Sequence, residues 1–257
     1  MNLDMKLGNE VWEGLVIDSA FELAVSFPER PLLKNVLKKI GPLPEEALLL
    51  GLANDGFPVL LNLWNPTPGP LLITGDSGSG KTDFLKMVAS FVVSTHQPRE
   101  IQYSVITARP HEWEGYVDYP HCIGVFPTDG QGSMNFIRAL DAWTEMYRHS
   151  RQSVLLLIDE LADFIYWKSD LCRVLRKILL HGPEKKIWPI ATVNLESSQD
   201  VVSWLEYFHT RILGYTKHIN SIEYDCGQDT EFETLSKGTE FRLREGSEWI
   251  KFQIPRT

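Results

Sequence analysis

The stretch Leu71–Leu85, LLITGDSGSGKTDFL, decides the fold class of this chain. A short apolar run is followed by a glycine-rich bend, and Lys81 and Thr82 connect this bend to a segment with helical periodicity. Residues 75–82 match the pattern G-x-x-x-x-G-K-[ST] at every fixed position. Glycines let the backbone curl so that successive N–H groups point at one anion, and the following helix directs its positive end toward it. The stretch therefore predicts a strand, a phosphate-binding loop and a helix.

The loop residues are candidate ligands of ATP and Mg²⁺. Lys81 is expected to reach the β- and γ-phosphates, and the Thr82 hydroxyl is expected to ligate Mg²⁺. A chance match in a Gly/Ser linker is the alternative, but the strand before, the helix after and a second motif downstream argue against it. The residues expected to bind the nucleotide are Gly75, Asp76, Ser77, Gly78, Ser79, Gly80, Lys81, Thr82 and Asp83.

The second motif is VLLLIDEL, residues 154–161, in which four consecutive aliphatic residues precede Ile158 and two acids. Such a strand delivers Asp159 and Glu160 to the sheet edge beside the phosphate loop. Asp159 is expected to hold Mg²⁺ through water, and Glu160 to polarise the attacking water. An acidic first turn of a helix would explain the charges, but it would not explain their pairing with an intact loop.

Apolar runs alternate with helical periods on both sides of these motifs. Continuous apolar strands interleaved with helices indicate an α/β fold, with a mainly parallel sheet covered by helices on both faces. Ligands of such a sheet lie at the carboxyl ends of its strands. We expect strands at 70–74, 101–107, 121–126, 153–160, 187–192 and 210–215, helices at 81–93, 133–150 and 171–179, and flanking hairpins at 47–63 and 240–254.

Residues 1–45 are interpreted as an N-terminal helical extension, and residues 46–257 as the ATPase domain. Within the extension, AFELAV (20–25) and LLKNVLKKIG (32–41) have the pattern of short amphipathic helices. The two prolines of SFPERP separate them.

Composition limits the partners and the compartment. The net charge of −9 over 257 residues excludes a globally basic surface, so any contact with nucleic acid needs a local patch or a ring of subunits. No apolar run approaches the about 18 residues of a membrane helix, and the acidic N-terminus does not resemble a signal peptide. Cys122, Cys172 and Cys226 lack metal or disulfide spacing. We expect a cytoplasmic protein with reduced thiols and no membrane contact.

Several stretches together resemble the FtsK/HerA family of DNA translocases. They are LGLANDGFPVLLNLWNPTPGPLLITGDSGSGKTDFL (50–85), LLLIDELADF (155–164), KILLHGPEKKIWPIATVNLES (177–197) and FHTRILGYT (208–216). The resemblance covers about residues 46–252. It implies a RecA-like P-loop NTPase core, a hexameric ring with ATP between neighbouring subunits, and double-stranded DNA drawn through the pore.

The chain also departs from that family. The family's sensor strand usually ends in Thr-Gln, whereas here Thr192 and Asn194 stand as the candidate sensors. Where a Gly-Arg pair is common, Gly182 is followed by Pro183 and supplies no arginine. Arg211 matches an arginine common in the family's next strand, so it is the candidate finger that acts on a neighbouring active site. A structural ion pair is the alternative for Arg211.

The residues that would contact DNA are the part of the function that the sequence indicates least clearly. The densest basic stretch could track phosphates in a ring, or form a subunit interface or a solvated helix end. The aromatic segment His111–His121 could be a substrate or interface loop, or pack over the edge of the core. The residues of the basic stretch are Arg173, Arg176, Lys177, His181, Lys185 and Lys186.

The leading hypothesis is a Mg²⁺-dependent ATPase that forms a homo-oligomeric ring and moves double-stranded DNA, with a nuclease or mobile-element partner. A ring ATPase that moves protein in a secretion system is the alternative among motors, and the acidic net charge suits it. A third hypothesis, from another class, is a nucleotide-gated assembly module with little turnover.

Overall fold

The computed structural model of this chain describes residues 15–17, 30–146, 152–164, 167, 169–195, 201–217, 235–245 and 248–257. The strands are β1 Leu15–Ile17, β2 Ala47–Ala53, β3 Pro58–Asn62, β4 Leu71–Gly75, β5 Ile101–Thr107, β6 Cys122–Pro127, β7 Ser153–Asp159, β8 Ile187–Asn194, β9 Thr210–Leu213, β10 Glu240–Glu245 and β11 Glu248–Gln253. The α-helices are α1 Leu33–Ile40, α2 Lys81–Thr95, α3 Glu114–Val117, α4 Gln131–Met146, α5 Ser169–His181 and α6 Val202–Leu205. Short 3₁₀ helices are η1 Pro110–Trp113, η2 Leu161–Phe164 and η3 Pro183–Lys185.

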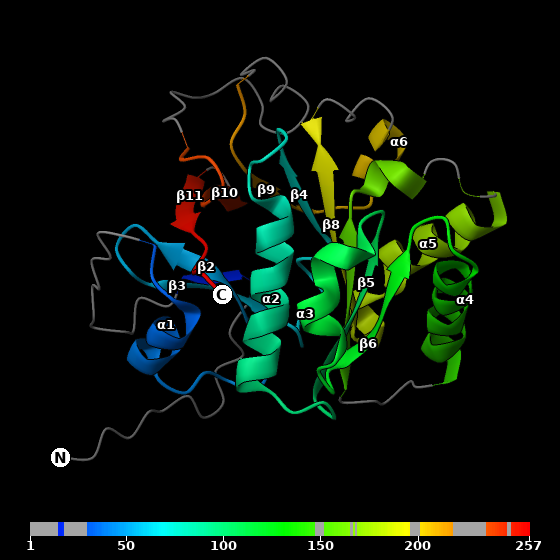
Figure 1. The fold of residues 1–257 in the computed structure, drawn as a ribbon, viewed down its shortest axis with the longest axis horizontal. Helices are drawn as coiled ribbons and strands as arrows, with labels where there is room; N and C mark the ends of the chain where they lie inside the picture. The colour runs from blue at the N-terminus through cyan, green and yellow to red at the C-terminus, as the bar shows by residue number, and fades with distance from the viewer. Residues whose placement is uncertain are drawn as a thin grey trace.

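Within these residues the strands form one 11-stranded sheet in the order β1-β3-β2-β11-β10-β9-β4-β8-β7-β5-β6 (Figure 1). The half from β9 to β6 is parallel. The other half is antiparallel and contains the β2–β3 and β10–β11 hairpins. The predicted α/β fold, with a mainly parallel core and flanking hairpins, is confirmed.

Register brings the ends of the parallel strands together at one edge of the sheet. Gly75 at the end of β4 lies opposite Asn194 of β8, and Thr107 at the end of β5 lies opposite Asp159 of β7. Because parallel strands share their direction, the loops that follow them meet at this edge. We call it the carboxyl edge.

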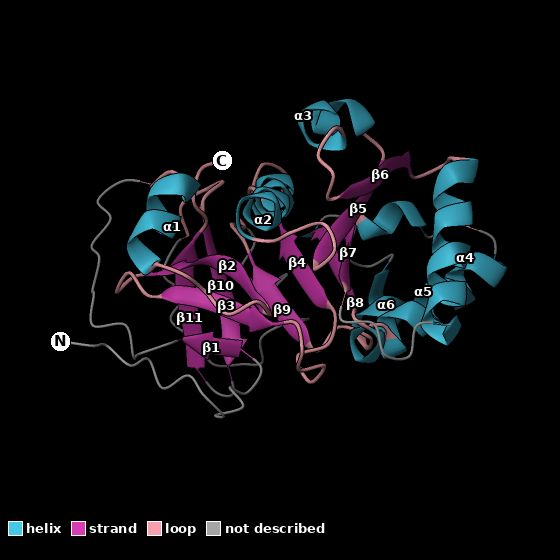
Figure 2. Ribbon diagram, turned by 90° about the horizontal axis from the view of Figure 1, so that it is seen from below, coloured by secondary structure: helices cyan, strands magenta, loops and turns pink. Residues whose placement is uncertain are grey.

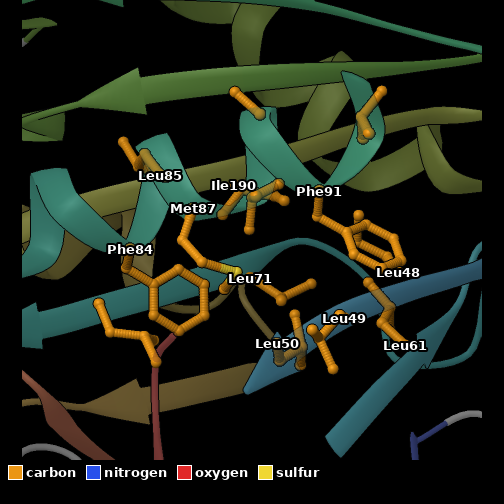
Figure 3. Close-up of a cluster of buried hydrophobic side chains, with 14 of the residues drawn as sticks. Leu48, Leu49, Leu50, Leu61, Leu71, Phe84, Leu85, Met87, Phe91 and Ile190 are labelled. Carbon is orange, nitrogen blue, oxygen red and sulfur yellow. The ribbon is translucent and has the colours of Figure 1, made fainter. Parts of the chain in front are cut away.

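Helices cover both faces of the sheet (Figure 2). On one face α2 buries Phe84, Met87 and Phe91 within a cluster of large apolar side chains. Figure 3 shows these side chains beside leucines of β2, and the cluster also includes Leu71 of β4 and Ile190 of β8. On the other face α4, α5 and α6 enclose a second apolar cluster. The strands between the two clusters are buried on both sides, which explains their unbroken apolar runs.

The N-terminal segment contributes a strand as well as a helix. β1 pairs antiparallel with β3, whereas only helices were expected before residue 46. The helix predicted at 32–41 is confirmed as α1, which buries Leu33, Val36 and Ile40 against the sheet. The helix predicted at 20–25 lies outside the described residues, and the boundary between residues 45 and 46 stays a prediction. None of the helices in the described part of the chain is long and apolar enough to span a bilayer.

Candidate functional site

The glycine-rich loop between β4 and α2 has the tight curvature that its sequence predicts. Gly78 and Gly80 have left-handed backbones, with φ of +75° and +90°. A methyl group built on Gly80 would lie 2.5 Å from the carbonyl oxygen of Gly238, so only glycine fits there. Ser79 is fully buried beneath the curl. The loop is therefore a backbone cradle whose shape depends on its glycines.

Lys81 begins α2 and folds back over the loop. Its Nζ donates hydrogen bonds to the carbonyl oxygens of Gly75 at 2.8 Å and Asp76 at 2.9 Å. Burial lowers the pKa of the Lys81 ammonium, and the carboxylates of Glu160 and Asp159 oppose that shift. The ammonium is thus held at the mouth of the cradle, where a phosphate oxygen would replace the carbonyls as its partner.

Asp159 is the buried acid of the site, with 4% of its side chain exposed. The Thr82 hydroxyl lies 2.9 Å from its Oδ1, and the Thr107 hydroxyl donates to its Oδ2 at 3.2 Å. The Arg109 guanidinium approaches Oδ2 at 3.9 Å. Hydroxyls from α2 and β5 therefore fix one carboxylate, and Thr82 and Asp159 lie as close together as two ligands of one ion would.

Glu160 follows Asp159 in a left-handed conformation, with φ of +80°. Such a backbone costs on the order of 1–3 kcal/mol for a residue other than glycine, so its surroundings must hold it. Its N–H donates to the Thr192 hydroxyl at 2.8 Å, and its carboxylate accepts the Asn194 N–H at 3.0 Å. Burial raises the pKa of the Glu160 carboxyl, while the Asn194 N–H and Lys81 oppose the shift. The conformation turns this carboxylate toward the end of β8.

Thr192 and Asn194 were predicted as sensors, and the structure shows how each contacts the acids. Besides Glu160, the Thr192 hydroxyl contacts Asp159 Oδ1 at 3.5 Å. The Oδ1 atom of Asn194 is buried and accepts no hydrogen bond from the described residues. A buried amide oxygen without a partner is costly, so a bound water or ligand is expected to satisfy it.

Asp76 anchors the cradle from below. Its carboxylate accepts hydrogen bonds from the Thr216 hydroxyl at 3.1 Å and the Lys217 N–H at 2.7 Å. Its own N–H donates to the carbonyl of Tyr215 at 2.9 Å. The carboxylate therefore ties the loop to the segment after β9, while the exposed Asp83 lies in the first turn of α2.

Sequence reasoning missed Thr107, Arg109 and Thr216. Thr107 ends a predicted strand and Arg109 follows it, but their approach to Asp159 depends on β5 lying next to β7. Arg109 also pairs with Glu112 at 2.9 Å. The sequence did offer one signal for such residues, since a polar residue at the end of a predicted parallel strand is expected to lie at the carboxyl edge.

The candidate finger Arg211 lies in β9, opposite Leu72 of β4. Its guanidinium donates to the carbonyl oxygens of Leu205 at 3.0 Å and Phe208 at 3.4 Å. These bonds hold the side chain against α6 within its own chain. Its action on a neighbouring active site stays a prediction.

The basic stretch has partners within the described fold. Lys177 pairs with Asp141 of α4 at 2.8 Å, and the Arg176 guanidinium lies 4.8 Å from the centre of the Trp204 ring. The Lys186 ammonium lies 5.8 Å from the centre of the Trp64 ring. These contacts tie three of the six basic residues to their own chain, and the contact of the stretch with DNA or with a neighbouring subunit stays a prediction.

In the aromatic segment, Trp113 is fully buried and packs edge-on against Tyr116 at 5.4 Å. The Tyr103 hydroxyl donates to the Tyr116 carbonyl. Packing over the edge of the core accounts for these contacts.

The donor set fits Mg²⁺-ATP. A hydroxyl and one carboxylate are hard oxygen ligands, and Mg²⁺ commonly takes few protein ligands together with phosphate oxygens and water. The left-handed glycines let the loop curl around an anion at the start of α2.

Comparison with known proteins identifies similar chains. No family model matches this sequence. The DNA translocase FtsK of Chlamydia pneumoniae is 30% identical over 144 residues, which span 55% of this chain and 16% of FtsK. Thermomonospora curvata EccC (ATPases 2 and 3), in complex with a signal sequence peptide, superposes with a TM-score of 0.66 at 14% identity, over 90% of this chain and 44% of EccC. The pCW3 conjugation coupling protein TcpA, with ATPγS, gives a TM-score of 0.63 at 14% identity, over 90% of this chain and 71% of TcpA.

These similarities agree with the geometry of the loop and its acids. The chain spans less than half the length of FtsK and of EccC, so the comparisons concern a core shared with larger proteins. The resemblance of the sequence to FtsK is confirmed, and the chain has the P-loop ATPase fold of FtsK/HerA-type motor domains.

Proposed function

We propose that this chain is a Mg²⁺-dependent ATPase of the FtsK/HerA type that works as an oligomeric ring, most simply a hexamer, and moves double-stranded DNA. The observation that supports hydrolysis is the meeting of Lys81, Thr82, Asp159 and Glu160 at the carboxyl edge. These residues combine a phosphate cradle, a hard-ion ligand pair and a second carboxylate placed to polarise water.

Each residue has a separate task in this proposal. Lys81 would exchange the carbonyls of Gly75 and Asp76 for phosphate oxygens, and Thr82 and, through water, Asp159 would hold Mg²⁺. When bound, the ion would supply positive charge that offsets the charge of the phosphates. Glu160 orients the attacking water and accepts its proton, and a raised pKa brings a carboxylate closer to that task. Asn194 offers its amide to the water or the γ-phosphate.

DNA is proposed as the substrate because part of the sequence resembles a DNA translocase. The net charge of −9 does not oppose this, since a ring concentrates a few cations around its pore. Arg211 would complete the active site of a neighbouring subunit. A nuclease or a mobile-element protein would supply the context in which the DNA is moved.

Protein is the second candidate substrate. The acidic net charge suits a motor without a polyanionic substrate, and a similar fold occurs in EccC, whose solved structure contains a signal sequence peptide. The site suits either motor, because both would hydrolyse Mg²⁺-ATP with the same residues.

A steady-state phosphate-release assay with and without duplex DNA tests the proposal. We expect Mg²⁺-dependent release that duplex DNA increases severalfold. Release that DNA leaves unchanged would favour the protein motor. Tight ATP binding without release would favour a nucleotide-gated assembly module and would contradict the proposed hydrolysis.

A further inference from the structure

The turn before β10 lies against the phosphate loop, although about 160 residues separate them in the sequence. A methyl group built on Gly78 would lie 3.0 Å from Lys237 Cε and 3.3 Å from its Nζ. The carbonyl oxygen of Gly238 occupies the corresponding space above Gly80. In Figure 1 this turn lies at the same end of the sheet as the start of α2.

Hydrogen bonds fix the turn in this place. The N–H groups of Thr239 and Glu240 donate to the Ser236 carbonyl oxygen, at 3.3 and 3.2 Å. The Glu240 carboxylate accepts the Ser236 N–H at 2.6 Å and pairs with Lys251 of β11 at 3.2 Å. Gly238 has φ of +83°, which a tight turn requires. The position of Lys237 therefore follows from the β10–β11 hairpin.

The ammonium of Lys237 is available to a ligand. The side chain is exposed, and among the described residues no hydrogen bond or ion pair engages its Nζ. Lys81, in contrast, already donates to two carbonyl oxygens of the loop. The two lysines thus flank the same cradle, one from the helix that follows the loop and one from a distant hairpin.

The balance of charges around the loop favours a second ammonium group, that of Lys237, beside the bound phosphates. Asp76, Asp159 and Glu160 carry three negative charges around the loop, against the positive charges of Lys81 and Arg109. A triphosphate adds about four more negative charges, of which Mg²⁺ compensates two. Another ammonium at the rim would reduce the remaining repulsion.

We infer that Lys237 is a second phosphate-binding lysine of this site, contributed by the same chain from the turn before β10. This inference rests on the proposed nucleotide site and adds a residue that lies outside its sequence motifs. The β10–β11 hairpin then acts as a wall of the nucleotide site, and an ammonium contact to phosphate would strengthen with the number of phosphates on the ligand.

The test compares Lys237→Met with Lys38→Met, which removes the same charge from an exposed position on α1. The dissociation constants of Mg²⁺-ATP, ADP and AMP are measured by calorimetry for the parent and both variants. For Lys237→Met we expect about tenfold weaker ATP binding, a smaller loss for ADP and unchanged AMP binding, because charge-assisted hydrogen bonds are among the strong ones. Lys38→Met should match the parent, and Lys237→Arg should recover most of the loss.

Three results would overturn the inference. Equal losses for AMP, ADP and ATP would mean that the side chain only shapes the loop. ATP binding as tight as in Lys38→Met would remove Lys237 from the site while the proposed function stood. A parent protein that binds no nucleotide would overturn both, so the two failures are distinguishable.

Discussion

The carboxyl edge of the parallel strands and the helical layer formed by α4 and α5 both carry many charged residues, but they use them differently. At the edge, hydroxyl groups from β5, β8 and α2 lie against Asp159 at the end of β7, and Asp159 is almost completely buried. In the layer, Lys177 meets Asp141 and Arg138 meets Asp170, and all four side chains are partly exposed.

The difference in burial distinguishes a functional site, at the carboxyl edge, from a surface whose charges only form exposed ion pairs. Buried charges are costly, so a fold retains them where several elements support a function. Exposed pairs contribute about 0–1 kcal/mol each and need no function to explain them. The following substitutions test this contrast, and their expected effects decrease in size.

Arg211 is the proposed finger, and its described hydrogen bonds go to carbonyl oxygens of its own chain. If it acts on a neighbouring subunit, Arg211→Ala lowers turnover about 10³-fold or more and retains ATP binding. Turnover is measured for Arg211→Ala alone and in mixtures with Glu160→Gln subunits. In a mixture, Arg211 of one chain and Glu160 of another can meet at one active site, so part of the turnover should return. Lost thermal stability with normal turnover per folded molecule would instead assign Arg211 to the packing of α6.

Glu160→Gln removes the proposed base and keeps the shape of the side chain. We expect turnover to fall about 10²- to 10⁴-fold with ATP affinity within a few fold of the parent. Single-turnover phosphate release and equilibrium ATP binding measure the two effects. Hydrolysis at the parent rate would remove Glu160 from the mechanism.

Thr107→Val removes one hydroxyl that holds Asp159 and keeps the branched shape of the side chain. We expect the Mg²⁺ concentration for half-maximal turnover to rise about tenfold, since groups that orient metal ligands typically have effects of that order. Thr144→Val in α4 is the matched control, because that hydroxyl bonds only to a carbonyl of its own helix among the contacts described. Equal Mg²⁺ dependence in both variants would contradict the support of Asp159 by Thr107.

Lys177→Met breaks the exposed ion pair with Asp141. We expect the free energy of unfolding in urea to change by less than about 1 kcal/mol and turnover to stay the same. A fall in DNA-stimulated turnover at unchanged stability would show that the helical layer contacts DNA. The layer would then be a functional region, contrary to the comparison with the carboxyl edge.

Local chemistry explains what could be predicted from the sequence. The phosphate loop, Asp159 and Glu160 belong to two short motifs, and the apolar runs beside them predicted β4, β7 and α2. Glycines and buried strands impose their conformation within a few residues, so no knowledge of distant contacts was needed.

The remaining parts of the site depend on contacts between distant segments. Thr107 reaches Asp159 because β5 lies next to β7, and Lys237 reaches Gly78 because β10 returns beside β9. The strand order that creates these contacts is not encoded in any one segment. Likewise, β1 is too short for its pairing with β3 to leave a pattern in the sequence.

A crystal structure with a non-hydrolysable ATP analogue and Mg²⁺ tests the central claim most directly. We predict the triphosphate in the cradle of residues 75–82, the Lys81 ammonium on its phosphates instead of on the Gly75 and Asp76 carbonyls, and Mg²⁺ beside Thr82 and Asp159. An empty loop at saturating analogue, with Lys81 still on those carbonyls and Thr82 still 2.9 Å from Asp159, would contradict it.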